Sequence, residues 1–188
     1  FDLEAACCGF LYSLDVAATM IESGRYKKII VIGADKMSSL VDYQDRATCV
    51  LFGDGAGAVL VEATEEENVG VQNSYLRTDG IGLPFLHMKA GGSVCPPSHC
   101  TVAHRLHSLY QEGRTVFRYA VTDMSNDVAE VMKRNNLTAD DVRWVVPHEA
   151  NLRIIEAVTK RIGLPMDKVV VNIERYGNKS AATIPLAL

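Results

Sequence analysis

The spacing of apolar residues predicts four helical segments. One face of the first helix carries apolar residues at helical intervals, namely Phe10, Leu14, Ala17 and Ile21. Ser23-Gly24 supplies its stop, because glycine readily takes the left-handed position after a last turn. The same period predicts helices over 115–135 and 152–162, and a shorter helical pattern begins at Ser180.

Apolar runs between these helices predict strands. Residues 29–33 are typical of a strand buried on both faces, and so are residues 169–171. Further short strands are expected over 48–52, 58–61, 69–76 and 144–146. Because Asp54-Gly55 lies between the first two of these, we expect them to form a hairpin. Thr138 to Asp141 has the pattern of a helix start.

Two parts of this pattern repeat. Cys7 precedes a helix and then the strand at Ile29, 22 residues on, and His148 precedes a helix and then the strand at Val169, 21 residues on. The repeat indicates a duplicated α/β unit, in which the two helix starts face each other. Open α/β sheets bind their ligands at such a switch point.

Composition narrows the function classes. The 188 residues are 48% hydrophobic and 22% charged, which suits an ordinary globular protein of one large domain or two smaller halves. A net charge of −4 without a basic, aromatic-rich run argues against nucleic acid as a partner. No apolar stretch is long enough to cross a membrane, and the N-terminus does not have the pattern of a signal peptide. The chain begins without methionine and ends in mid-pattern, so we expect an excerpt from a longer protein.

Five cysteines, an odd number without secretory marks, argue against a disulfide framework and favour the reducing cytoplasm. Cys7 and Cys8 stand at a helix start, where the helix dipole and unpaired N–H groups favour a thiolate. The alternative is that both are small apolar packing residues.

His148 and Asn178 also stand between an apolar run and a helix. Taken alone, His148 is better explained as a surface histidine on a connection, and Asn178 is commonly a capping or turn asparagine. Together with Cys7 they occupy equivalent junctions of three α/β units. A cysteine, a histidine and an asparagine so placed supply a nucleophile, a base or proton donor, and a hydrogen-bonding partner.

Six ordered motifs carry a family resemblance, and they cover residues 2–10, 45–48, 51–58, 113–117, 146–154 and 176–182. In these motifs the chain resembles the β-ketoacyl-acyl-carrier-protein synthase III family of condensing enzymes. The family motif has its cysteine two places before a Gly-Phe pair, which selects Cys7 over Cys8.

The resemblance implies the α/β thiolase-like fold, a duplicated α/β/α/β/α sandwich that is incomplete here because N-terminal and C-terminal segments are missing. Residues 1–77 would end the N-terminal half that carries the nucleophile. Residues 78–114 would be a connecting loop. Residues 115–188 would be part of the C-terminal half that carries the histidine and the asparagine.

The resemblance also implies the reaction. Cys7 would take an acyl group from acyl-coenzyme A (acyl-CoA) as a thioester. His148 and Asn178 would hydrogen-bond the thioester oxygen of malonyl-acyl carrier protein while carbon dioxide leaves, and the resulting carbanion would attack the Cys7 thioester. This step initiates fatty-acid synthesis, and it uses no metal and no cofactor. The acyl carrier protein and a second copy of the chain, in a homodimer, are the implied partners.

Binding residues follow from the same resemblance. The CoA channel would be lined by Arg46, Gly113, Arg114, Phe117, Ala150 and Asn151. Candidates for receiving the acidic carrier protein are Arg118, Arg153, Lys160 and Arg161, for which ordinary solvated helix charges are an equal explanation. Glu149 stands where glutamine is commoner in the family, and we expect it to alter the channel rather than the chemistry.

Three alternatives remain. Condensing enzymes or acyltransferases of polyketide or secondary metabolism share the three residues and differ in substrate. A papain-like hydrolase has the same order of cysteine, histidine and asparagine, although its local cysteine signature is absent. A zinc-binding interaction module could use donors of residues 79–107, namely Cys95, His99, Cys100, His104 and His107, although their spacing matches no standard finger.

Overall fold

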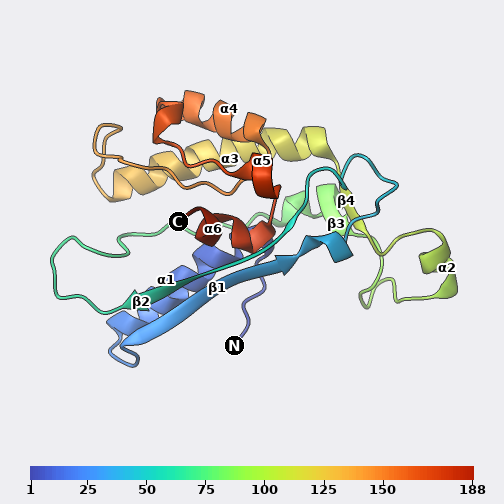
Figure 1. The fold of residues 1–188 in the computed structure, drawn as a ribbon, viewed down its shortest axis with the longest axis horizontal. Coiled ribbons are helices and arrows are strands. Elements are labelled where there is room, and N and C mark those ends of the chain that lie inside the picture. Colours follow the sequence, from blue (N-terminus) through green and yellow to red (C-terminus); the bar gives the residue numbers. More distant parts are fainter.

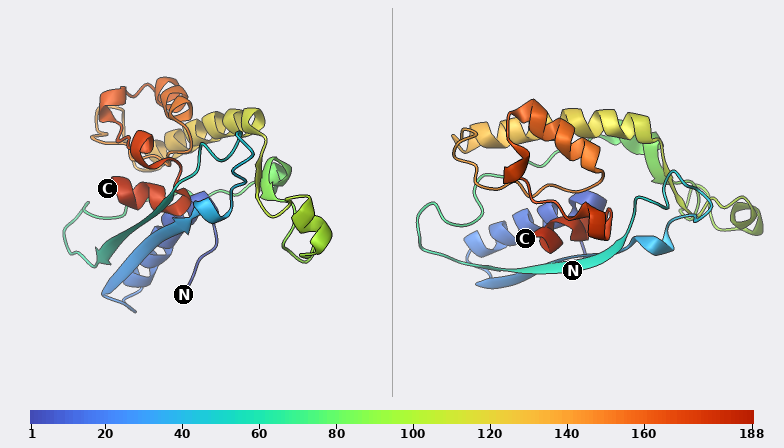
Figure 2. Two further views of the ribbon diagram at one scale, coloured as in Figure 1. Left: turned by 45° about the vertical axis from the view of Figure 1, so that its right-hand side comes forward. Right: turned by 45° about the horizontal axis from the view of Figure 1, so that its top comes forward.

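The chain folds into layers, which the computed structural model describes for all residues 1–188 (Figure 1). The helices are α1 (Gly9–Glu22), α2 (His99–Ala103), α3 (Gly113–Arg134), α4 (Leu152–Ile162), α5 (Ile173–Tyr176) and α6 (Thr183–Ala187). The strands are β1 (Lys28–Lys36), β2 (Asp54–Glu62), β3 (Leu86–Met88) and β4 (Leu109–Gln111). In Figure 2, α3 and α4 form one outer layer, β1 and β2 form the other, and α1 and α6 lie between them.

The main helices agree with the predictions from apolar spacing. Helix α1 is followed by Gly24 at φ 74°, and α4 by Gly163 at φ 74°, so glycine takes the left-handed position after both. The pattern that begins at Ser180 is a 3-10 helix, Ser180–Ala182, which continues into α6. The expected helix start at Thr138 is wrong. There the carboxylate of Asp141 accepts hydrogen bonds from the backbone N–H and hydroxyl of Thr138, and the segment forms only a turn.

The expected hairpin between 48–52 and 58–61 is also wrong. Strand β2 runs through the glycine cluster and pairs antiparallel with β1, so that Gly33 lies opposite Gly57. Residues 48–51 form turns instead. The glycines are needed for close packing, because a Cβ on Gly57 would lie 2.9 Å from the backbone nitrogen of Leu186 in α6. Close approach of α6, rather than a tight turn, therefore explains the glycine-rich sequence.

Three other expected strands are reduced or absent. Residues 69–76 are not a strand; in this segment Ser74 hydrogen-bonds Asp15 of α1. The strands expected over 144–146 and 169–171 are reduced to one parallel bridge between Val145 and Val169. The physical reason is that a strand needs pairing partners, and these segments pair only with each other, through that one bridge.

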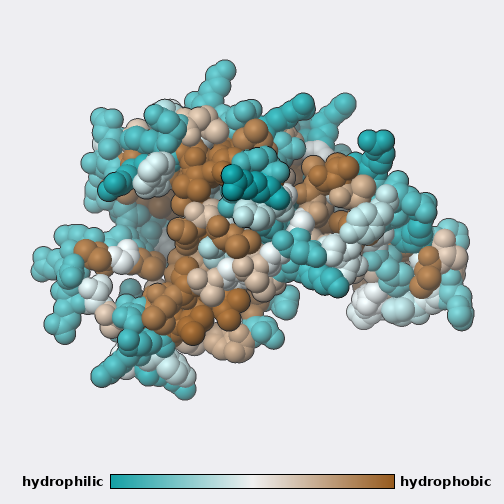
Figure 3. All heavy atoms as spheres, in the orientation of Figure 1, coloured by the Kyte–Doolittle hydropathy of each residue, from teal (hydrophilic) through white to brown (hydrophobic).

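Strand β1 is covered on one face only, which corrects the expectation of burial on both. Val31 and Gly33 point inward, whereas Ile30 and Ile32 are 65% and 62% exposed. The covered face joins a core shared by α1, β1 and α6, made of Phe10, Ala17, Val31 and Ile184. Figure 3 shows apolar atoms gathered over the exposed surface of β1 and β2.

The packing of α6 on β2 leads to a stability prediction for the full-length protein. Gly57→Ala would place a Cβ 2.9 Å from backbone atoms of both Pro185 and Leu186, so it should lower the free energy of unfolding by about 1–3 kcal/mol. Gly80→Ala is the matched control, because a Cβ there meets nothing within 4 Å. Urea denaturation measures both variants, and equal midpoints for the two would contradict this packing.

No helix of the protein combines the length and the hydrophobicity needed to cross a membrane.

Candidate functional site

Cys7 lies in a short 3-10 helix, Ala6–Cys8, immediately before α1. This turn packs against the 3-10 helix Ser180–Ala182. The Ser180 side chain lies close enough to the Cys7 thiol to lower its pKa. Ala6 and Ser180 have positive φ angles of 44° and 52°, which non-glycine residues rarely adopt. Strained backbone on both sides of a thiol is typical of a functional site.

Burial, with smaller contributions from Cys8 and from the Asp35 carboxylate, raises the pKa of the Cys7 thiol to about 11. The Ser180 side chain opposes this shift without overcoming it. The expectation of a thiolate at the helix start is therefore wrong for the resting protein, because loss of hydration outweighs the helix terminus. Cys7 is a thiol near neutral pH, and it needs a base when it reacts.

Asn178 is buried and oriented by backbone contacts. Its Oδ1 accepts a hydrogen bond of 2.9 Å from the backbone N–H of Ser180. Its own backbone is held by hydrogen bonds to Leu51 and from Gly53, where the chain forms a parallel bridge ahead of β2. Since the amide oxygen is occupied, the Nδ2 hydrogens are the groups of this side chain that can donate to a ligand.

His148 follows the short parallel bridge at Val145 and precedes α4. Its Nδ1 atom is buried and has no hydrogen-bond partner. Burial first, and then the positive charge of Lys179, lower the pKa of His148 to about 4. The imidazole is therefore neutral at pH 7 and can accept a proton or donate one hydrogen bond.

The segment 178–180 is linked to each of the other two predicted residues. The Ser180 side chain lies near the Cys7 thiol, and the Ser180 backbone N–H donates to Asn178. Lys179, between them in sequence, is the charged group that acts on His148. Ser180 and Lys179 were not predicted as site residues; their signal in the sequence is that they follow Asn178 within the motif 176–182.

The residues assigned to the CoA channel occupy three places. Gly113, Arg114 and Phe117 are exposed at the start of α3, and Arg46 is exposed in the loop before β2. Ala150 and Asn151 immediately precede α4, where Asn151 caps the helix by accepting a 2.9 Å hydrogen bond from the backbone of Arg153. The carrier-protein candidates Arg118, Arg153, Lys160 and Arg161 are all exposed.

The donors considered for zinc do not converge. Cys100 contacts His104 at 3.6 Å, whereas His107 hydrogen-bonds Thr101 at 2.9 Å. No group of three or more histidine, cysteine, aspartate or glutamate side chains is placed to hold a metal ion. Helix α2, which carries Cys100, projects away from the layered body (Figure 1).

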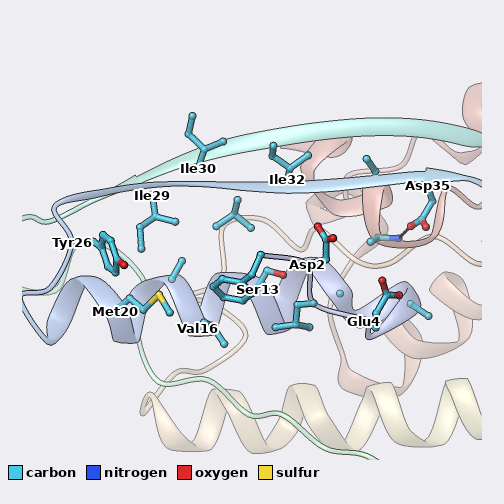
Figure 4. Close-up of a pocket in the computed structure, with 18 of the residues that line it drawn as sticks. Asp2, Glu4, Ser13, Val16, Met20, Tyr26, Ile29, Ile30, Ile32 and Asp35 are labelled. Carbon is cyan, nitrogen blue, oxygen red and sulfur yellow. Dashed lines mark hydrogen bonds between the residues drawn. The ribbon is translucent and has the colours of Figure 1, made fainter.

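A groove of about 770 Å³ runs along α1 and β1, next to the Cys7 turn. Figure 4 shows Val16 and Met20 of α1 and Ile29 of β1 among its lining side chains, with Asp2 and Glu4 near one end. The groove reaches Ala6 and Gly9 on either side of the two cysteines.

The raised pKa of Cys7 leads to a prediction about its reactivity. Alkylation of Cys7 by iodoacetamide should accelerate with rising pH up to about 11, because the thiolate is the reacting form. Ser180→Ala removes the hydroxyl that lowers this pKa, and it should shift the profile to higher pH. Peptide mass spectrometry measures the rate, with Ser23→Ala, at the far end of α1, as the control. A rate already maximal at pH 7 would contradict the shift.

The layered fold and the links of Cys7 and His148 to the segment 178–180 agree with the class that the motifs indicated, the condensing enzymes of the thiolase fold. Solved structures share the fold. Over the whole chain, the 3-oxoacyl-acyl-carrier-protein synthase III of Aquifex aeolicus superposes with a TM-score of 0.87 at 41% identity, and that of Thermus thermophilus with 0.88 at 41%. The chain covers 56% and 57% of those proteins, so its fold is an incomplete form of theirs.

The family model for 3-oxoacyl-acyl-carrier-protein (ACP) synthase III matches residues 1–80. The model for the C-terminal part of the same synthase matches residues 132–188. The chain belongs to this family, which removes the papain-like alternative. It is 64% identical to β-ketoacyl-acyl-carrier-protein synthase III of Phocaeicola vulgatus and 66% identical to synthase III 2 of Bacteroides thetaiotaomicron. Both alignments cover all 188 residues, and the chain spans about half, 56%, of the length of these relatives.

Proposed function

We propose that the full-length protein condenses an acyl-CoA primer with malonyl-acyl carrier protein and so initiates fatty-acid synthesis. The observation that carries this proposal is the packing of the Cys7 turn against the Ser180–Ala182 turn, whose Ser180 backbone N–H is bonded to Asn178. A neutral His148, whose pKa the charge of Lys179 lowers, completes the set. The relatives named above are synthases of this kind, which supports the same reaction here.

In the first half-reaction the Cys7 sulfur attacks the thioester carbon of acyl-CoA. A new carbon–sulfur bond forms, the bond to the CoA sulfur breaks, and the thiol proton passes to the leaving CoA. Because burial keeps Cys7 protonated near neutral pH, this proton must be removed as the sulfur attacks. A neutral His148 is the base we assign to that transfer.

In the second half-reaction malonyl-acyl carrier protein replaces CoA. The Asn178 amide and the His148 ring donate hydrogen bonds to its thioester oxygen, which becomes an enolate oxygen as carbon dioxide leaves. Donors fixed where charge develops lower the barrier. The carbanion then attacks the carbonyl carbon of the Cys7 thioester, the bond from that carbon to the Cys7 sulfur breaks, and the β-ketoacyl product is released. The resulting thiolate takes a proton from water. Every step uses these side chains and the two substrates, so we propose no cofactor and no metal.

The remaining assignments complete this proposal. Residues 1–77 and 115–188 belong to the two thiolase-like halves, joined by 78–114. Gly113, Arg114 and Phe117 at the start of α3, Ala150 and Asn151 just before α4, and Arg46 line the CoA channel. The exposed cations Arg118, Arg153, Lys160 and Arg161 receive the acidic carrier protein. The protein works as a homodimer in the cytoplasm, where the free thiol of Cys7 persists.

A second candidate has one specific observation in its favour. The priming β-ketosynthase of the R1128 polyketide biosynthetic pathway is 36% identical over the whole chain, with a TM-score of 0.84. A polyketide or secondary-metabolite condensing enzyme would use the same three residues on a different primer.

A primer panel separates the two candidates. The full-length protein is incubated with malonyl-acyl carrier protein and acyl-CoA primers from acetyl to long-chain, and the β-ketoacyl product is quantified. Turnover with short primers and the fatty-acid carrier protein supports the first candidate. Turnover only with a carrier protein of a polyketide pathway would support the second, and no condensed product with any primer would refute both.

A further inference from the structure

Two charged side chains are fully buried directly beside the proposed active site. Glu149 and Lys179 are each 0% exposed. Glu149 directly follows His148 in the chain, and Lys179 directly follows Asn178. A buried carboxylate and a buried ammonium group each carry a large desolvation cost, so their presence requires compensating contacts.

Asn172 joins the two charges. Both carboxylate oxygens of Glu149 lie 3.0 Å from the backbone nitrogen of Asn172, which donates to them. The Nζ of Lys179 donates a 2.7 Å hydrogen bond to Oδ1 of the same asparagine, and it lies 5.3 Å from the centre of the Tyr176 ring. Burial raises the pKa of Glu149, and the positive charge of Lys179 opposes that shift. One asparagine therefore connects the two residues that follow His148 and Asn178.

The His148 side chain needs such support more than Asn178 does. Asn178 is oriented by Ser180 and by its backbone contacts with the segment ahead of β2. The buried Nδ1 of His148 has no hydrogen-bond partner, so no contact of that atom fixes the ring. The position of the imidazole then depends on its own backbone, and the next residue along, Glu149, is the one anchored to Asn172.

We propose that Glu149 and Lys179 are positioning residues, which act through Asn172 to hold the His148 and Asn178 donors at the separation needed for decarboxylation. This inference rests on the proposed function of the site. It also corrects the expectation that Glu149 alters the CoA channel, because its carboxylate is enclosed and bonded to the backbone of the neighbouring segment. If the role of these two residues were purely structural, their substitution would lower stability without changing the chemistry of the folded protein.

The test uses the full-length protein with Glu149→Gln, Lys179→Met and the double variant, and it follows two half-reactions separately. Malonyl-carrier-protein decarboxylation needs both donors, whereas Cys7 acylation does not use the Asn178 amide. Each single variant leaves one buried charge unpaired and should lower kcat for decarboxylation by about 10- to 100-fold, with KM within about twofold, because small misplacements of reacting groups are costly. Acylation of Cys7 should fall much less in Lys179→Met, because that step does not use the Asn178 amide. In Glu149→Gln it should fall as well, because His148 is the base of that step.

The double variant leaves no unpaired buried charge and should recover part of the lost decarboxylation rate. Glu156→Gln, an identical change on the exposed face of α4, is the matched control and should match the wild type. Rates are expressed per folded molecule, with the folded fraction taken from circular dichroism.

Unchanged decarboxylation in both single variants would overturn the inference. Equal losses in both half-reactions, accounted for by unfolding, would also overturn it by showing a structural role alone. The inference is supported if the wild-type protein acylates Cys7 and condenses normally while both single variants lose decarboxylation rate. A wild-type protein that does not decarboxylate malonyl-carrier protein would refute the proposed function, and this inference with it.

Discussion

Cys7→Ser should reduce condensation by the full-length protein by about three orders of magnitude or more, because removing the nucleophile of such a site removes most of its rate enhancement. A serine hydroxyl is far less acidic than the thiol, and burial at this position already raises the pKa of the more acidic cysteine to about 11. Loss of β-ketoacyl product, followed by chromatography with a labelled primer, measures the effect.

Cys8→Ser is the control for this substitution, since Cys8 is exposed and adjacent in the same turn. It should retain condensation within about twofold, as surface substitutions usually perturb little. If Cys8→Ser lost activity and Cys7→Ser kept it, the family motif would have selected the wrong sulfur.

Asn178→Ala should lower malonyl decarboxylation about 100- to 1,000-fold, or about 3–4 kcal/mol, the typical cost of losing one donor to a developing oxyanion. Acylation of Cys7 should persist in this variant, because the amide is assigned only to the second half-reaction. His148→Ala should slow both half-reactions, since the ring is assigned as base in the first and donor in the second. Single-turnover assays with each substrate measure the two steps.

The contrast between these two variants is what tests the assignment. If Asn178→Ala and His148→Ala reduced acylation and decarboxylation equally, the division of roles would be wrong. Thermal melts of both variants are needed, because Asn178→Ala also frees the backbone N–H of Ser180 from its 2.9 Å hydrogen bond.

The helices were predictable because their signals are local. Apolar residues recur every three or four positions, and glycines after α1 and α4 take the left-handed conformation. The strands were predictable only in part, because strand pairing depends on distant segments. The glycine run of β2 looked like a turn because only the folded chain brings α6 against Gly57.

The sequence indicated Cys7, His148 and Asn178 as candidates because each stands just before a helix, and the family motif then selected Cys7 over Cys8. The pKa values of these side chains could not be predicted from the sequence. The helix start favours a thiolate at Cys7, but burial raises its pKa, and the sequence contains no direct measure of burial. The Glu149–Asn172–Lys179 network was equally hidden, because Glu149 and Lys179 are far apart in sequence and look like surface charges until the fold encloses them.

The central claim is that Cys7 carries the acyl group between the two substrates. The most direct measurement incubates the full-length protein with acetyl-CoA, quenches it with acid, and maps the added acyl mass to a peptide. The account predicts an acetyl group on Cys7 alone, lost when malonyl-acyl carrier protein is added and replaced by free β-ketoacyl product. An acetyl group on another residue, or condensed product formed without acetylation of Cys7, would contradict it.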